Sequence, residues 1–112
     1  MFAPHHDLNN LTIIIDNNNL QSLESVDSTL SLKPLGEKLK AFGWAVYTVN
    51  GHNHNELKAA LTCAKESSKP AALIMLTTKG KGVSFMENSV AWHYKSPNDD
   101  ELSKALGEVL LP

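Results

Sequence analysis

Two polar loops carry the side chains in this sequence that could hold a metal ion and a diphosphate. Residues 16–19 read Asp-Asn-Asn-Asn and follow a short apolar run. An amide oxygen is a hard, neutral ligand, so an Asn oxygen, a backbone carbonyl and one carboxylate from elsewhere would form a magnesium cradle around a diphosphate. Residues 79–82 read Lys-Gly-Lys-Gly, in which lysine can neutralise a phosphate and glycine lets the backbone come close. The alternatives are a polar turn that only ends a strand, and an ordinary exposed Lys-Gly turn.

His93 is the third candidate, because it follows Trp92 in a segment without a clear period. A histidine held near a phosphate or a hydroxylated substrate could donate a hydrogen bond or shuttle a proton near neutral pH. Most loop histidines are solvated and take no part in chemistry, which is the alternative here.

Other chemistry-bearing residues favour structural interpretations. His52 and His54 stand two residues apart, but a zinc site needs further ligands and the stretch coincides with an expected turn and helix cap. Cys63 falls inside a predicted helix, where we expect a small buried thiol. His5 and His6 are adjacent and therefore point apart, which indicates a solvated end.

The elements that position these residues alternate between strands and helices. Apolar runs without alternation predict strands at residues 11–16, 44–49 and 71–78, the first of them buried on both faces. A helix begins at Pro34, with Leu35, Leu39 and Phe42 on one face, and ends at Gly43. A second helix is capped by Asn53 or Asn55, with one stripe formed by Leu57, Ala60, Leu61 and Ala64. A last helix starts at Ser96-Pro97, and its apolar face comprises Leu102, Ala105, Leu106, Val109 and Leu110.

This order predicts an α/β fold with a parallel sheet and βαβ crossovers. Because such a sheet binds ligands at the carboxyl ends of its strands, residues 16–19, residues 79–82 and His93 are expected at one edge. Residues 21–32 hold seven Ser or Thr and are expected to form a surface excursion. Crossovers in one direction would place successive helices on one face of the sheet. The other face and both edges would then lack cover, so the chain is expected to need further residues or a partner.

Composition limits the classes of function. The chain has 112 residues, room for one small domain, and a net charge of −2 without a block of Lys or Arg. An electrostatic case for nucleic acid is therefore missing, and no apolar run approaches the ~20 residues of a membrane span. The N-terminus lacks the pattern of a signal peptide. A single cysteine fits a reducing compartment, and we expect a cytoplasmic protein.

The whole chain resembles the second half of the thiamine-diphosphate-binding domain of transketolases, and is most similar to the N-terminal subunit of the split, two-chain type. The matching stretches are Asp7-Leu8-Asn9-Asn10-Leu11, Asp16-Asn17-Asn18-Asn19-Leu20-Gln21, Pro34-Leu35, Ala41-Phe42-Gly43-Trp44, Asn50-Gly51-His52, Lys69-Pro70, residues 78–88 and Trp92-His93. Their order and spacing match over nearly all of the chain.

The resemblance implies specific roles for four residues. Asn18 would supply its side-chain oxygen to Mg²⁺ and Leu20 its main-chain carbonyl. Lys79 would reach the cofactor, thiamine diphosphate, and His93 would lie near its diphosphate and the hydroxyls of the donor sugar. The family usually has Gly where this chain has Asn19, a mild departure because Asn tolerates a left-handed backbone.

The resemblance also implies missing parts. Only 17 residues precede Asn18, so the family's Gly-Asp-Gly motif, about 30 residues upstream, cannot be present, and Met1 aligns as an internal start. The glutamate that activates the cofactor belongs to the family's other domain. Residues 1–112 are therefore expected to form a partial thiamine-diphosphate-binding domain of a transketolase, active on sugar phosphates only in a dimer or higher assembly with a complementary chain. The alternative is a truncated, non-catalytic paralogue or assembly piece that docks on a full-length partner.

Overall fold

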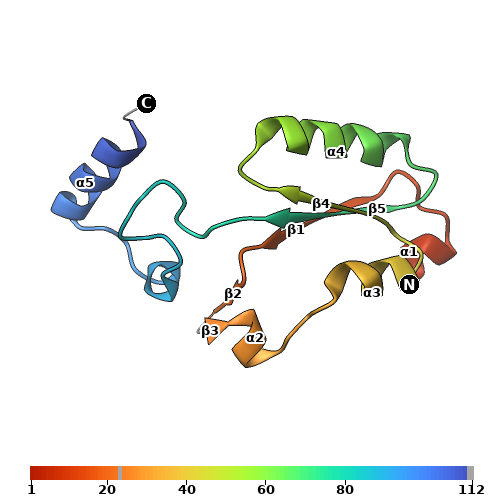
Figure 1. The fold of residues 1–112 in the computed structure, drawn as a ribbon, viewed down its shortest axis with the longest axis horizontal. Helices are drawn as coiled ribbons and strands as arrows, with labels where there is room; N and C mark the ends of the chain where they lie inside the picture. Colours follow the sequence, from red (N-terminus) through yellow and green to blue (C-terminus); the bar gives the residue numbers. More distant parts are fainter. Residues whose placement is uncertain (23, 111–112) are drawn as a thin grey trace. The chain divides into compact units, whose positions relative to one another are not determined.

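The computed structural model describes residues 1–22 and 24–110, and it divides into two compact units (Figure 1). The first unit comprises residues 1–18 and 32–77. The second comprises residues 19–31 and those from 78 onward. The predicted sheet lies in the first unit, and the loop and helix after the sheet lie in the second.

The first unit contains a three-stranded parallel sheet in the order β1-β5-β4. Its strands are β1 (Thr12–Asn17), β5 (Ala71–Leu76) and β4 (Ala45–Asn50). Ile14 pairs with Leu73 and Leu73 with Tyr47, so the three strands run in register. The predicted α/β class with a parallel sheet is confirmed, and the strand limits differ from the predicted ones by one or two residues.

The centre of the sheet is β5, not β1. Residues 71–74 are buried, and Leu73 is fully covered. In contrast, 56% of the Ile14 side chain in β1 is exposed. The expectation that the first strand is buried on both faces was wrong, because β1 is an edge strand whose apolar run continues past the cover that the described residues supply.

Two helices cover opposite faces of the sheet (Figure 1). On one face α4 (His54–Glu66) packs its Ala60 and Ala64 against Leu73. On the other, α3 (Leu35–Ala41) approaches Ile74, the next residue of β5, through Gly36. The expectation of successive helices on one face was wrong. The chain passes from β1 over β5 to β4 and then returns to β5, and two right-handed crossovers in opposite directions lie on opposite faces.

The helix ends follow local signals. The Asn53 side chain accepts hydrogen bonds from the backbone N–H of Asn55 and Glu56, so Asn53 is the cap of α4. Gly43 adopts φ +94° just after α3, which ends as predicted. Cys63 is exposed on α4, so the predicted buried thiol was wrong: its position points away from the Ala60–Ala64 stripe that packs on the sheet. At the N-terminus a short helix, α1 (Phe2–His5), precedes the sheet.

The second unit is built from short elements. It contains the two-stranded antiparallel sheet β2 (Leu20–Gln21) and β3 (Glu24–Ser25), α2 (Val26–Thr29), the 3₁₀ helix η1 (Val90–His93) and α5 (Asp99–Val109). The expected surface excursion at residues 21–32 is largely exposed, and its residue 23 lies outside the described residues. η1 was not predicted.

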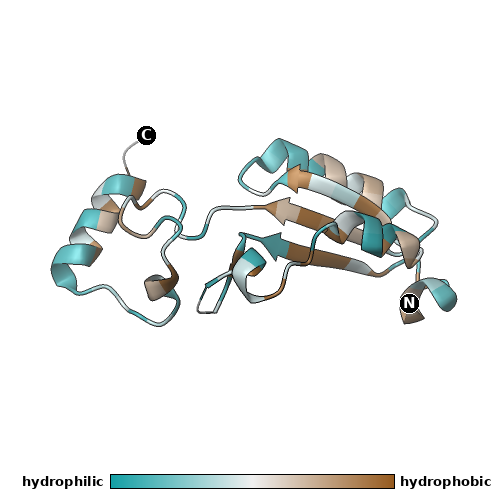
Figure 2. Ribbon diagram, turned by 60° about the horizontal axis from the view of Figure 1, so that its bottom comes forward, coloured by the Kyte–Doolittle hydropathy of each residue, from teal (hydrophilic) through white to brown (hydrophobic). Residues whose placement is uncertain are grey.

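The last helix begins later than predicted, at Asp99 rather than at Ser96-Pro97. Asn98 and Glu101 form a capping box, in which each side chain accepts a hydrogen bond from the other's backbone N–H, at 2.9 Å in both cases. On the predicted apolar face only Ala105 is buried. Figure 2 shows hydrophobic residues concentrated on the strands of the parallel sheet, with hydrophilic residues along the helices and loops. Within residues 1–22 and 24–110, no helix combines the length and the hydrophobicity needed to cross a bilayer.

Candidate functional site

The carboxyl ends of β1 and β5 meet in the first unit. Asn17 pairs with Leu76 at the last position of the ladder, and the Thr77 backbone N–H donates to the Asn17 carbonyl. The Thr77 hydroxyl donates to the Asp16 carboxylate. This contact orients the acid of the predicted amide loop immediately before Asn18. Asn18 is half-buried and is the last residue of this unit.

The end of β4 lies against the same edge. The Gly51 N–H donates to the Leu76 carbonyl at 2.8 Å, which draws the turn after β4 onto the end of β5. The Glu56 carboxylate accepts hydrogen bonds from the Asn50 N–H and the Asn53 side chain, both at 2.9 Å. The turn that contains His52 therefore serves as a rigid link between strand and helix, in line with its structural interpretation.

In the second unit, Asn19 adopts the left-handed conformation, with φ +60°. The expectation that Asn replaces the family's Gly at a left-handed position is confirmed, since Asn is one of the few side chains that tolerate this backbone. The Asn19 carbonyl accepts a hydrogen bond from the Val26 N–H at 3.0 Å, which closes the hairpin containing Leu20.

The loop at residues 79–82 is a tight turn, with φ +71° at Gly80 and +93° at Gly82. Lys81 lies 3.5 Å from the Glu87 carboxylate, which also accepts from the Gly82 N–H at 3.1 Å. Lys79 is half-buried, and its carbonyl accepts from the Asn88 N–H at 3.0 Å. Among the described residues Lys79 has no ion pair, so it is the cation of this turn that remains available to an anionic ligand.

His93 ends η1 and is exposed. Its neighbour Trp92 anchors the segment: the indole N–H donates to the Phe85 carbonyl at 2.9 Å, and the two rings pack with centroids 5.3 Å apart. The Lys95 ammonium lies 4.4 Å from the Trp92 ring centroid, a cation–π contact. His93 packs edge-on against Tyr94, at 4.6 Å between centroids. His93 is thus presented to solvent from a segment that its neighbours hold.

Helix α5 is tied to the same loop by Glu108. Its carboxylate accepts hydrogen bonds from the Ser84 backbone N–H and, at 2.8 Å, from the Ser84 hydroxyl. These bonds lower the pKa of Glu108 below its ordinary value. The Lys95 ammonium and the Asn98 N–H likewise lower the pKa of Glu101. Sequence reasoning missed the Ser84–Glu108 link, because its partners are 24 residues apart and have no local signature.

The predicted site residues fall in separate units. Asn18 closes the first unit, whereas Leu20, Lys79 and His93 all belong to the second. The donor set fits a magnesium diphosphate in its chemistry: an amide oxygen and a backbone carbonyl suit Mg²⁺, and a lysine beside two glycines suits a phosphate. Sequence reasoning also missed the Asp16–Thr77 hydrogen bond, since it depends on β1 and β5 being neighbours.

A parallel sheet with polar loops at the carboxyl ends of its strands defines an α/β ligand-binding domain. Residues 1–108 match the family model described as the transketolase, thiamine diphosphate binding domain. The chain therefore belongs to the family of transketolase thiamine-diphosphate-binding domains.

Individual proteins give the same result. One of the two subunits of an apulose-4-phosphate transketolase from Actinobacillus succinogenes is 37% identical over 107 residues, which are 96% of this chain and 39% of that protein. A 6-deoxy-6-sulfo-D-fructose transketolase subunit from a Clostridium species is 34% identical over 110 residues, 97% of this chain and 40% of that protein. The crystal structure of Campylobacter jejuni transketolase superposes with a TM-score of 0.90 at 30% identity, over 96% of this chain and 17% of that one. The chain spans about two fifths of the length of the two bacterial subunits.

Proposed function

We propose that this chain is part of a transketolase-type enzyme that transfers a two-carbon ketol unit from a ketose phosphate to an aldose phosphate. The observation that carries the proposal is the match of residues 1–108 to the thiamine-diphosphate-binding domain. The two bacterial relatives are named as transketolase subunits, which supports a two-chain enzyme. The single cysteine fits a cytoplasmic location.

The chain's own residues would bind and orient thiamine diphosphate and Mg²⁺. The cofactor, when bound, supplies the carbon centre that accepts the two-carbon unit. Asn18 would donate its amide oxygen and Leu20 its main-chain carbonyl to the metal, while Lys79 would neutralise the diphosphate. His93, exposed at the end of η1, would serve as the catalytic candidate. It would donate a hydrogen bond to a hydroxyl of the donor sugar or move a proton near neutral pH.

The remaining parts of the site would come from a complementary chain. That chain would bring the Gly-Asp-Gly half of the domain, with a carboxylate for Mg²⁺, and the domain that holds the cofactor's pyrimidine. This chain alone is therefore expected to have no transketolase activity, and sugar phosphates would bind only to the dimer or higher assembly.

The experiment is isothermal titration of the assembled complex with thiamine diphosphate and Mg²⁺. Magnesium holds its ligands at about 2.1 Å with little slack, so Asn18→Ala should weaken cofactor binding strongly while the melting temperature of the cofactor-free complex stays constant. Asn55→Ala, which removes the same group from an exposed position on α4, is the control and should change neither. Unchanged magnesium-dependent binding together with a lower melting temperature would show that Asn18 only ends the strand.

A second candidate function is that of a non-catalytic paralogue that docks on a full-length partner. The observation that favours it is the length of the match, about two fifths of the bacterial subunits. The same titration separates the two, because a docking piece would form the complex without adding any magnesium-dependent binding of thiamine diphosphate.

A further inference from the structure

Strand β1 has one bonded edge and one open edge. The carbonyls of Leu11 and Asn17 accept hydrogen bonds from the β5 segment. Because backbone groups alternate in direction along a parallel strand, those of Thr12, Ile14 and Asp16 point away from β5. The described residues include no strand on that outer side of β1.

The sequence of β1 is typical of an interior strand. Natural edge strands are protected by Lys, Pro, a bulge or an inward-pointing charge. β1 reads Thr-Ile-Ile-Ile-Asp-Asn, pairs with β5 without a bulge, and carries its one charge at the fifth of six positions. Unbroken apolar runs of this kind belong to parallel strands that are covered on both sides. The open edge is therefore built to receive another strand.

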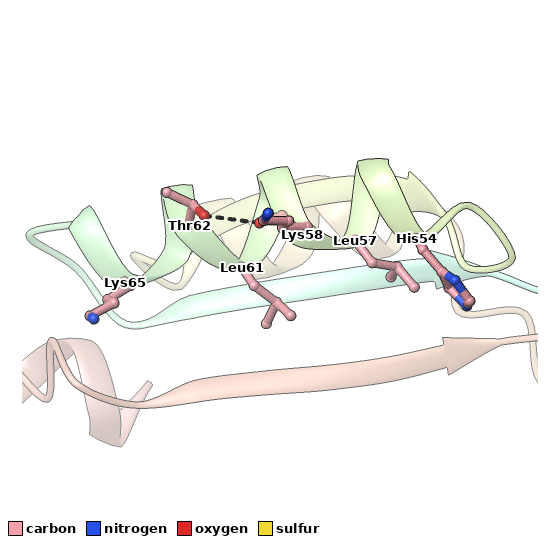
Figure 3. Close-up of a pocket in the computed structure, with 6 residues that line it drawn as sticks. All are labelled: His54, Leu57, Lys58, Leu61, Thr62 and Lys65. Atoms are coloured by element: carbon pink, nitrogen blue, oxygen red, sulfur yellow. Dashed lines mark hydrogen bonds between the residues drawn. The ribbon is translucent and has the colours of Figure 1, made fainter.

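A groove on α4 lies beside this edge, on the same face of the sheet. It has a volume of about 430 Å³ and is lined by His54, Leu57, Lys58, Leu61, Thr62 and Lys65. Figure 3 shows Leu57 and Leu61 projecting from α4 on the side of β1. Ile14 faces the same side, because its register partner Leu73 packs under α4. Ile14 is 56% and Leu61 46% exposed, so apolar surface continues from the helix to the strand.

The chemistry of the groove favours a protein segment over a small molecule. Small-molecule sites combine an enclosed apolar wall with converging polar groups, whereas this lining comes from one face of a single helix. Its charged side chains, Lys58 and Lys65, are cationic, and no carboxylate is among the lining residues. A partner with aliphatic residues at its centre and carboxylates at its margins would be complementary. A parallel strand also needs a crossover helix, which lies on a face of the sheet.

We propose that β1 and the α4 groove bind a strand–helix unit of the complementary chain. The strand adds in parallel to the open edge of β1, and the apolar face of the helix fills the groove beside Leu57 and Leu61, with its acidic residues opposite the two lysines. This inference rests on the proposed function, in which a second chain completes the domain. The bacterial subunits extend well beyond the two fifths that this chain matches, so segments outside the match are the source of the occupant.

The test co-expresses this full chain with a separate polypeptide carrying the part of the Actinobacillus succinogenes subunit outside the match. The dissociation constant is then measured by sedimentation and titration. Leu61→Glu places a carboxylate in the apolar groove and should raise Kd at least tenfold. Ala59→Glu is the control: it adds the same charge to α4 on the β4 side of the helix and should leave Kd within twofold. Lys65→Glu should raise Kd severalfold and more at low salt than at high salt.

A second measurement does not depend on the folding of variants. Hydrogen exchange on the unmodified pair should show new protection of the Ile14 and Asp16 amides, which point to the open edge. Equal effects of Leu61→Glu and Ala59→Glu, unprotected β1 amides, or no association at all would overturn the docking proposal. A homodimer that Leu61→Glu dissociates would also overturn it in favour of a second copy. Association at this face without binding of thiamine diphosphate would instead refute the proposed function and leave the docking surface in place.

Discussion

Gly51→Ala tests whether the turn after β4 holds the carboxyl edge of the sheet in place. An added Cβ at residue 51 would lie 2.4 Å from Thr77 Cγ2, 3.0 Å from Met75 Cβ and 3.3 Å from the Leu76 carbonyl oxygen. Carbon atoms in optimal contact are about 3.5–4.0 Å apart. The methyl group therefore needs a shift of about 1 Å from a neighbour that β5 holds on its other side.

The size of the effect follows from these contacts. Inserting a methyl group into a well-packed position typically costs about 1–3 kcal/mol. Replacing Gly by Ala also restricts the unfolded chain, which offsets about 0.4–1 kcal/mol of that loss. Gly51→Ala should thus lower the free energy of unfolding by about 1–2 kcal/mol.

A functional consequence accompanies the loss of stability. Thr77 is the residue that must move, and its hydroxyl donates to Asp16 in the loop leading to Asn18. Binding of thiamine diphosphate with Mg²⁺ to the assembled complex should therefore weaken. The assays are urea unfolding followed by circular dichroism, and titration with the cofactor.

Gly36→Ala is the matched control in the same unit. Its Cβ would lie 3.7 Å from both Ile74 Cδ1 and Val46 Cγ1, which is ordinary contact, and its place in α3 favours Ala by about 0.5–1 kcal/mol. This variant should be as stable as the parent chain or more stable, with unchanged cofactor binding. A Gly51→Ala chain that matches Gly36→Ala in stability would refute the close packing at the carboxyl edge.

Three further predictions concern other parts of the molecule. The chain by itself should self-associate at micromolar concentration, because β1 has an open apolar edge; a stable, cooperative monomer in sedimentation would contradict this. Folding lowers the pKa of Glu108, so its contribution to stability is present above its ordinary pKa of about 4.3 and is lost as the pH falls through the lower value of the folded state. Glu108→Gln should flatten the loss of unfolding free energy between pH 6 and pH 3, and an unchanged acid limb would count against the Ser84–Glu108 link. Asn98→Ala removes the capping box of α5 and should cost about 1 kcal/mol, whereas Ser103→Ala on the same helix should cost less in the same urea titration.

The order of the elements could be predicted from the sequence, because each depends on contacts between near neighbours. Periodicity located the helix that buries Ala60 and Ala64, and a side-chain cap placed its start at Asn53. The left-handed backbone at Asn19 was predicted from residue type, since few side chains accept a positive φ. The match of residues 1–108 to a cofactor-binding family was also visible in the spacing of short motifs.

Which strand lies at the centre was decided only by the tertiary structure. β1 and β5 are both continuous apolar runs, and nothing local distinguishes the exposed Ile14 from the buried Leu73. The order β1-β5-β4 arises because the chain crosses to the far edge and returns, which also places α3 and α4 on opposite faces. Contacts between residues far apart in sequence follow from that order. The Asp16–Thr77 hydrogen bond joins residues 61 positions apart, and it exists only because β1 and β5 are paired.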